Sequence, residues 1–425
     1  MKKKIELLAP AGSLEKAKYA FAYGADAVYL GIPDFSLRVR INKFDLNDVK
    51  EIIDYAHKIK KKVYITVNIV AHNHHLEALP KYLKKINEWQ PDALIISDPG
   101  VFELTKKYCP KIKKHLSTQA NATNFATVKF WHKNGFERII LGRETTLEEI
   151  KEISQKNPRC ELEYFVHGAM CMSYSGRCML SSWLVGRSAN LGDCVQPCRW
   201  AYKIKDAKII EANITEPKRP NLNIPVEEDS HGTYIFNSKD MCFIEYLPEM
   251  MSAGISSFKI EGRAKSPAYL ATVVKAYREA FDFIIKEKDP KKIKTKLKFL
   301  KKKYLDDLVH RGYTTGFLFG RDTVEQNLTE THIESEEEFV GEVLDSKKNG
   351  QTFEVLIRPH NAIRVGDNIR IMQIKNPDLI FSIKEMYNEK GKKIESGHGG
   401  ADYNIILKTK KPVEKMSIIF AKLKK

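Results

Sequence analysis

Four cysteines lie close together in the middle of the chain, at a spacing that is typical of metal ligation. Cys171, Cys178, Cys194 and Cys198 are separated by six, fifteen and three residues in a chain of 425 residues and seven cysteines. A chain of this length can bury a full core without disulfides, and an odd number of cysteines with no secretory leader predicts a reducing compartment. Thiolates that lie together in such a compartment usually bind a metal.

Zinc and an iron-sulfur cluster are the two metal centres to consider, because both prefer soft sulfur ligands. Structural zinc sites usually have two short CxxC pairs, whereas the first pair here is separated by six residues and the last by three. The spacing therefore favours a cluster. Gly168, Gly176 and Gly192 lie near the cysteines and would let the backbone turn around an inorganic core. The alternative is that the cysteines are buried and pack as small apolar side chains.

Short apolar runs alternate with amphipathic helical patterns along the first two thirds of the chain, as in repeated βα units. We predict eight strands, at 5–9, 27–30, 63–68, 93–97, 115–118, 138–141, 162–166 and 258–260. The helical patterns include 13–23 and 46–59, the second with Val49, Ile52, Ile53 and Ala56 on one face. The sequence therefore predicts an α/β fold, a (β/α)8 TIM-like barrel over residues 1–330.

Polar side chains follow the predicted strands, at the end of a barrel where active sites form. They are Ser36, Arg38, Arg40, Asn68, Asp98, Gln119, Asn121, Arg143, Glu144, His167, Glu261 and Arg263. The cysteine-rich segment also begins at a strand end, so we predict an insertion over 168–240 that lies at the barrel mouth. Cys242 follows at the predicted start of a helix over 241–253, where a helix N-terminus favours a thiolate. Cys109 and Cys160 are isolated, and we expect them to be structural.

The composition indicates an anionic partner. The formal net charge is +17 at pH 7, and a basic surface attracts polyanions such as RNA. Residues 286–303 contain ten lysines at the spacing of a helix, which would contact phosphates or simply form a solvated face. No apolar run is long enough for a membrane helix, so we expect a cytoplasmic protein with no membrane partner.

After about residue 335 the pattern changes to short strand-like runs separated by turns. The runs are FVGEVLD, QTFEVLIRP, DNIRIMQ, FSIKEMY, YNIILKT and MSIIFAKL. Six such strands predict a small C-terminal β-barrel domain over 335–425. Small barrels of this kind often bind RNA, although the pattern alone assigns no task to this one.

The segment around the first two cysteines resembles the signature of the collagenase-like peptidases, family 32 of the peptidases of unknown catalytic type. The shared residues are Glu163, Phe165, Gly168, Ala169, Met170, Cys171, Gly176, Cys178, Leu180 and Ser181. Within that family the chain is most similar to the prephenate-dependent tRNA uridine hydroxylases, through the stretches YAFAYGADAVYLG, SLRVR, SDPG, NATNFATVKFW, NSKDMC, SFKIEGR and HRGYT. The resemblance extends from about residue 5 to the C-terminus.

The resemblance implies hydroxylation of a wobble uridine of tRNA at C5, giving 5-hydroxyuridine, with prephenate as the donor in place of molecular oxygen. With it we expect a 4Fe-4S cluster held by Cys171, Cys178, Cys194 and Cys242. Cys242 is preferred to Cys198 because NSKDMC is among the similar stretches and a CVQPC pair would crowd two ligands into one turn. Four cysteine ligands leave no iron open, which favours electron transfer or a structural role. An electron donor or cluster-assembly proteins are then further partners.

Several side chains are candidates for the chemistry. Prephenate is a dicarboxylate, and guanidinium groups bind carboxylates with two parallel hydrogen bonds. Arg38, Arg40, Arg143 and Arg263 are the candidates for this contact, and Glu144 or Glu261 are acids with which they would otherwise pair. We also count Glu261 among the candidate catalytic residues. His167 is a candidate proton carrier, and His310, Arg311 and Tyr313 are candidates to contact phosphate or an unpaired base.

A peptidase is the alternative from another class, since the family has that name. The sequence has no GxSxG elbow and no HExxH helix, and a cysteine nucleophile would have to come from the group assigned to metal. A non-catalytic RNA-binding scaffold is a third interpretation, which the polar residues at the predicted strand ends disfavour.

Overall fold

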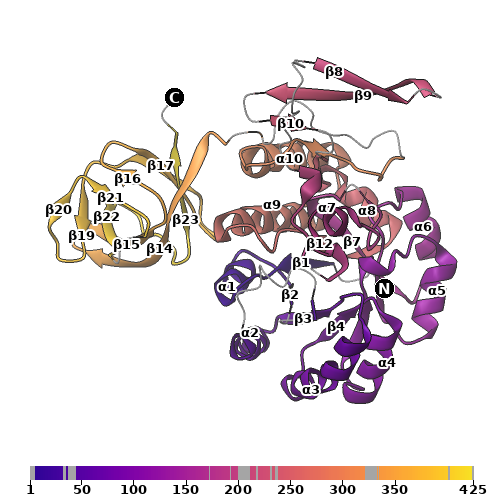
Figure 1. Ribbon diagram of the computed structural model, residues 1–425. Helices are drawn as coiled ribbons and strands as arrows, with labels where there is room; N and C mark the ends of the chain where they lie inside the picture. Colours follow the sequence, from indigo (N-terminus) through magenta and orange to yellow (C-terminus); the bar gives the residue numbers. More distant parts are fainter. Residues whose placement is uncertain are drawn as a thin grey trace.

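A closed barrel of eight parallel strands forms the first part of the protein (Figure 1). The computed structural model describes residues 5–31, 35–36, 45–171, 173–191, 193–199, 211–216, 219–229, 232–234, 238–320, 333, 335–400 and 403–423, with only the backbone at 190, 199 and 211–234. The barrel strands are β1 (Glu6–Pro10), β2 (Ala27–Gly31), β3 (Lys62–Val67), β4 (Ala93–Ile96), β5 (Lys113–Leu116), β6 (Arg138–Ile140), β7 (Glu161–Gly168) and β12 (Ile255–Ile260). The seam between β12 and β1 and the pairing of β12 with β7 close the barrel. The predicted (β/α)8 fold is confirmed.

A helix follows each barrel strand and packs on the outside. These helices are α1 (Leu14–Ala22), α2 (Leu46–Lys58), α3 (Asn73–Trp89), α4 (Pro99–Tyr108), α5 (Phe125–Lys133), α6 (Leu147–Lys156), α8 (Leu247–Ala253) and α9 (Pro267–Lys286), with α10 (Pro290–Leu300) and a π turn η6 (Lys301–Leu305) after them. Local sequence fixes their starts: Ser13 and Asp45 accept hydrogen bonds from the first free N–H groups of α1 and α2. No helix in the described part of the chain is long and apolar enough to cross a membrane.

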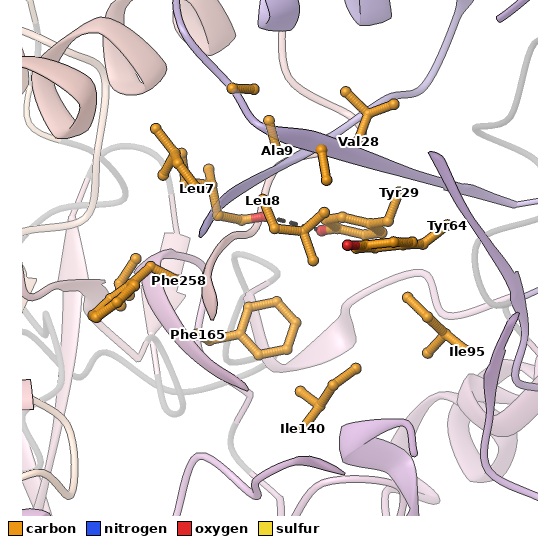
Figure 2. Packing of buried hydrophobic residues seen from close by; sticks show 14 of the residues in the cluster. Leu7, Leu8, Ala9, Val28, Tyr29, Tyr64, Ile95, Ile140, Phe165 and Phe258 are labelled. Carbon is orange, nitrogen blue, oxygen red and sulfur yellow. Dashed lines mark hydrogen bonds between the residues drawn. The ribbon is translucent and has the colours of Figure 1, made fainter. Parts of the chain in front are cut away.

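The barrel interior has a charged layer beneath an apolar one. Arg138 on β6 donates to Glu6 on β1 at 2.5 Å and to Glu163 on β7 at 3.1 Å. Lys259 on β12 donates to the other oxygen of Glu163 at 3.0 Å. Figure 2 shows Tyr29, Ile95, Ile140 and Phe165 converging in the interior, together with Tyr64. Charges buried this deeply require partners, so the network fixes which side chains face inward on four strands.

Between β7 and β12 the chain leaves the barrel and returns. This excursion contains α7 (Leu180–Val185), the 3-10 turns η3 (Ala189–Leu191) and η4 (Pro197–Arg199), and a three-stranded antiparallel sheet of β8 (Glu211–Glu216), β9 (Arg219–Asp229) and β10 (Gly232–Tyr234). It ends in β11 (Asp240–Cys242), which pairs antiparallel with the end of β7 and parallel with β13 (Tyr313–Thr314). The short turn η5 (Ile244–Tyr246) then leads into α8.

The residues after 335 form an antiparallel β domain beside α1 and α9 (Figure 1). Its main sheet has the order β18-β17-β23-β14-β15-β22-β19-β20. The strands are β14 (Glu337–Asn349), β15 (Thr352–Pro359), β16 (Ile363–Arg364), β17 (Asn368–Met372), β18 (Leu379–Ser382), β19 (Met386–Asn388), β20 (Lys393–Ile394), β21 (Ser396–Gly397), β22 (Ile405–Thr409) and β23 (Ile418–Lys422). Tyr23 of α1 donates to the carbonyl oxygens of Met372 and Met416 at 3.1 and 3.0 Å, and Lys275 of α9 donates to that of Gln373 at 2.8 Å. The two domains therefore share a packed, hydrogen-bonded interface.

Candidate active site at the barrel mouth

A cavity of about 280 Å³ lies at the carboxyl ends of the barrel strands, and we call it the mouth cavity. Its barrel-derived lining residues are Tyr29, Thr66, Asn68, Ile95, Ser117, Thr118, Gln119, Ile140, Arg143, Phe165, Lys259, Glu261 and Arg263. They come from β2 to β7 and β12 or the loops that follow these strands. The floor is apolar and the wall is polar, which is the usual make-up of a site for a small polar molecule.

The cysteine-rich insertion forms the other side of the mouth cavity. It contributes Ala169, Cys171, Tyr174, Ser175, Gly176, Cys178, Arg187, Ala189, Asp193, Cys194, Gln196 and Cys198. All four clustered cysteines thus line one cavity, with Cys171 and Cys194 exposed and the other two half-buried. The structure therefore brings the clustered cysteines and the strand-end side chains to the same place.

Two close contacts hold the start of the insertion against the barrel. The Glu144 carboxylate accepts a hydrogen bond from the Ser175 backbone N–H at 2.6 Å. Gly176 has a φ of +76°, and a Cβ at this position would lie 2.2 Å from the carbonyl oxygen of Gln119. Only glycine combines this backbone conformation with so close an approach, so the turn between Cys171 and Cys178 depends on it.

Two further hydrogen bonds order the segment that carries the later cysteines. The Ser181 hydroxyl, buried on α7, accepts a hydrogen bond from the Val195 backbone N–H at 3.2 Å. The Gln196 backbone N–H donates to the Cys194 sulfur at 3.3 Å. Helix α7 is therefore connected directly to the segment that carries Cys194 and Cys198.

The donor types at the mouth cavity fit an iron-sulfur cluster, because four thiols face one space and an N–H group already points at one sulfur. The thiols are not gathered in ligating positions: in the part of the chain that the structure describes, no group of three or more His, Cys, Asp or Glu side chains is arranged to hold a metal ion.

Cys242, the predicted fourth ligand, does not line the mouth cavity. It lies in strand β11 opposite His167, not at a helix start, because pairing with β7 extends the backbone there. Its side chain is buried, and burial raises the pKa of its thiol to about 12, with a hydrogen bond to Tyr277 acting in the opposite direction. Cys198, the alternative that the sequence offered, does line the mouth cavity.

Cationic side chains are grouped in the mouth cavity. Arg143 lies over the Phe165 ring at 3.9 Å, and its buried Nε has no hydrogen-bond partner among the described residues. Arg263 is buried and reaches the Thr66 hydroxyl at 3.5 Å. Lys259 rises from the charged layer below, where its partner is Glu163. The cavity can therefore accept an anionic group against three separate cations.

Lys259 and Arg187 are site residues that sequence reasoning missed. Lys259 lies on β12, and Glu261 follows the end of that strand two residues later. Side chains alternate along an extended chain, so the sequence predicts that the two face the same side. That alternation is the signal that would have found Lys259. Arg187 donates to Asp193 at 2.8 Å, and both belong to the insertion, where no repeating pattern is available.

Other predicted site residues lie elsewhere. His167 is fully buried among the rings of Tyr269, Tyr277 and Tyr313, away from the mouth cavity. Burial lowers its pKa to about 3, so it is neutral. This placement does not support the predicted role of His167 as a proton carrier at the cavity. The predicted Arg38 and Arg40 lie outside the described residues.

The residues of the HRGYT stretch are also buried. Arg311 forms an ion pair with Asp240, and His310 stacks on the Tyr313 ring at 3.9 Å between ring centres. The Tyr313 hydroxyl donates to the carbonyl oxygen of Leu305 at 2.9 Å. These side chains brace β11 and β13, and this placement does not support the predicted contact with phosphate or a base.

Two more of the strand-end residues have local structural roles. Asp98 accepts a hydrogen bond from the Val101 N–H at 2.9 Å and caps α4. Asn121 donates to Glu144 at 3.3 Å. Glu144 therefore receives hydrogen bonds from two sides and connects the loops after β5 and β6 with the insertion.

The fold and the site together define a TIM-barrel protein whose C-terminal mouth is covered by a thiol-bearing insertion. Residues 12–328 match the model of peptidase family U32, and residues 335–419 match that of the family's C-terminal domain. The chain belongs to peptidase family U32.

Curated relatives extend this relationship along most of the chain. "tRNA hydroxylation protein P" of Haemophilus influenzae is 39% identical, over 94% of this chain and 92% of that protein. The protein of the same name from Escherichia coli is 40% identical, over 91% of this chain and 90% of its own length. "23S rRNA 5-hydroxycytidine C2501 synthase" of Escherichia coli is 35% identical, over 67% of this chain and 40% of that protein. The chain is thus similar both to proteins named for tRNA hydroxylation and to one named for hydroxylation of rRNA.

Proposed function

We propose that this protein is an RNA-modifying enzyme that hydroxylates a uridine of tRNA at C5, at the wobble position. The observation that carries the proposal is the mouth cavity, in which four thiols from the insertion face cationic side chains from the barrel. Relatives that align with nearly the whole chain are named for tRNA hydroxylation, and a more distant one for hydroxylation at C5 of a cytidine in rRNA. Hydroxylation of RNA is what these names share, and the one name that specifies a base specifies a pyrimidine.

The cavity also supports a small dicarboxylate, prephenate, as the co-substrate. At about 280 Å³ it is close to the smallest cavities that hold small molecules. Arg143 and Arg263 present guanidinium groups to it from two different strand ends, and Lys259 adds an ammonium group from below. Two carboxylates on one small molecule would each find a cation, while Phe165 and Tyr29 cover its apolar part.

An iron-sulfur cluster is the cofactor that the thiols would hold, and we assign Cys171, Cys178, Cys194 and Cys198 as its ligands. The assignment to Cys198 instead of Cys242 follows from the shared cavity and from the burial of Cys242. When bound, a cluster of this kind supplies electron transfer. The surrounding arginines would compensate the negative charge that thiolate ligation brings into the cavity.

A peptidase is less well supported at this site. A cysteine nucleophile needs a base, usually a histidine, within hydrogen-bonding distance. Among the described residues that line the mouth cavity there is no histidine. The buried His167 is neutral and lies among tyrosine rings.

The proposal is tested by nucleoside mass spectrometry of total tRNA from cells that lack the gene, complemented with the wild type or with the Cys178→Ala variant. We expect 5-hydroxyuridine to disappear on deletion, to return with the wild type and to stay absent with the variant. Unchanged 5-hydroxyuridine in the deletion strain would refute the proposal. Activity that depends on added prephenate in a reconstituted reaction would establish the co-substrate.

A further inference from the structure

Helix α7 and its N-cap expose two apolar side chains near the mouth cavity, Met179 and Trp183, and we call these two residues the α7 patch. Trp183 is 79% exposed and Met179 is 73% exposed, although both are large apolar side chains. Contiguous apolar surface of this kind is uncommon on soluble proteins and usually marks a place where something binds.

The orientation of α7 is fixed by a buried anchor. The exposure of the patch is therefore a feature of the fold and not the result of a loosely attached segment. Ser181 is buried and bonded to the segment with the later cysteines. Residues two apart on a helix lie about 200° apart around its axis, so Trp183 faces away from that anchor. Met179 and Trp183 are four residues apart and share one face of the helix. The backbone N–H of Trp183 donates to the backbone carbonyl oxygen of Met179 at 2.9 Å, as in a regular helical turn. The fold therefore presents the indole outward.

The patch lies at the edge of the mouth cavity. Cys178 and Arg187, which flank α7 in sequence, both line the cavity. A six-residue helix is only about 9 Å long, so Trp183 lies within about 10 Å of the cavity wall. Tyr174, 58% exposed, lies on the cavity side of the same segment. Two exposed aromatic rings thus belong to a segment that lines the mouth cavity, Tyr174 in the lining itself and Trp183 on the helix that follows.

Cationic groups lie beside these rings. Arg177 is exposed and forms no salt bridge with a described residue, and it shares a turn with Tyr174, to whose carbonyl oxygen its N–H donates at 3.0 Å. Arg187 is half-buried on the other side of α7. Arg187 pairs with Asp193, whereas Arg177 forms no ion pair with a described residue. A segment that carries an exposed indole, an exposed phenol ring and an exposed guanidinium group is suited to a ligand that alternates flat rings with negative charges, which is a single-stranded nucleic acid.

We infer that the α7 patch is the binding surface for unpaired nucleotides of the RNA substrate, with Trp183 stacking on a base beside the one that enters the mouth cavity. This inference rests on the proposed function. It assigns the recognition of single-stranded RNA to the insertion, because the bases of a duplex have no free face for Trp183. The arginines contribute phosphate contacts that carry no sequence information.

The test measures binding of the full-length protein to a labelled RNA hairpin with an unpaired loop, and to a blunt duplex of the same stem. We expect Trp183→Ala to weaken hairpin binding by about 5- to 150-fold, which is the effect of losing one stacked base. Trp183→Phe should bind within about threefold of the wild type, because a phenyl ring still stacks. Phe130→Ala is the matched control, since Phe130 is 58% exposed on α5, far along the chain from the insertion, and should bind as the wild type does.

The outcomes separate the inference from the function on which it rests. Equal hairpin binding by the wild type and Trp183→Ala, or equal losses for hairpin and duplex, would overturn the inference. A wild-type dimer that Trp183→Ala converts to monomers would identify the patch as an interface between copies and would also overturn it. Loss of hairpin binding in Trp183→Ala, with iron content and unfolding midpoint as in the wild type, supports it. Absence of 5-hydroxyuridine from cells with the wild-type gene would instead refute the proposed reaction and leave the binding result standing.

Discussion

Glu144 accepts a hydrogen bond from the backbone N–H of Ser175 at 2.6 Å, which connects the loop after β6 to the turn between the first two cysteines. Replacing Glu144 by Ala leaves that N–H without its charged acceptor. We expect iron content and tRNA modification to fall together, and the free energy of unfolding to drop by about 1.5–3 kcal/mol. Elemental analysis and chemical denaturation measure the two effects. Glu148→Ala, an exposed acid on α6, is the control and should change neither.

Substitution of two glycines in the insertion can separate the effect of a close contact from that of backbone strain. Gly176 and Gly186 both have positive φ, but a Cβ at Gly176 would meet the Gln119 carbonyl oxygen at 2.2 Å, whereas none of the neighbours lies within 4 Å of one at Gly186. We expect Gly176→Ala to lose most modification activity and Gly186→Ala to cost about 1 kcal/mol of stability with activity retained. Assays of tRNA modification in cells with each variant decide this. Equal activities would mean that the close approach to Gln119 does not position the cysteines.

Cys198 and Cys242 differ in their positions, and this difference can be tested by substitution. We expect Cys198→Ala to lose iron and 5-hydroxyuridine formation, because Cys198 lines the mouth cavity with three other thiols. Cys242→Ala should keep bound iron, although it leaves a small hole in a buried region. Cys109→Ala, also buried, controls for that packing effect. A variant set in which Cys242→Ala lacks iron while Cys198→Ala retains it would reverse the ligand assignment.

The charged layer of the barrel predicts a pH-dependent stability. Burial tends to raise the pKa of Glu6, but Arg138 and Lys62 outweigh it and lower the pKa to about 2. Because the folded-state pKa lies below the unfolded value of about 4.5, the stabilisation is complete above pH 4.5 and is lost as the pH falls towards 2. The loss is up to about 1.4 kcal/mol per pH unit. Denaturation at a series of pH values measures it.

Glu6→Gln should flatten that pH dependence. The variant lacks the titrating carboxylate, so its stability should fall less steeply than that of the wild type below pH 4.5. At neutral pH it should be less stable by up to about 3 kcal/mol, because the amide loses the attraction to Arg138 and Lys62 that lowers the pKa of Glu6. Arg138 keeps Glu161 and Glu163 as partners. Glu51→Gln removes an exposed ion pair with Lys18 and should cost less than about 1 kcal/mol. Parallel pH profiles for the wild type and Glu6→Gln would contradict this account.

The barrel was predictable from sequence because each βα unit has its own local pattern. All eight strands overlap the apolar runs that predicted them, although β5 begins two residues and β12 three residues before the predicted start. The four residues assigned to the inner face of the second helix are its buried residues. These signals depend on neighbours within a few positions. Packing of the helices on the strands then follows from the same periodicity.

Long-range contacts were beyond the reach of such patterns. Arg138 and Glu6 are 132 residues apart, and Lys259 and Glu163 are 96 residues apart, so no local pattern pairs them. Cys242 was predicted at a helix start from its following sequence, but pairing with β7 places it in a strand. Tertiary pairing overrides local preference there, and it also decides which cysteine reaches the cavity.

The seam between β1 and β12 has a consequence for synthesis on the ribosome. About 250 residues separate β1 from its closing partner β12 along the chain. At ordinary translation rates the ribosome needs roughly 12 to 50 seconds to synthesise them, and β1 cannot pair with β12 before then. The turns that carry Cys171 to Cys198 leave the ribosome within that interval. In the nascent chain these thiols are therefore exposed while the barrel is still open.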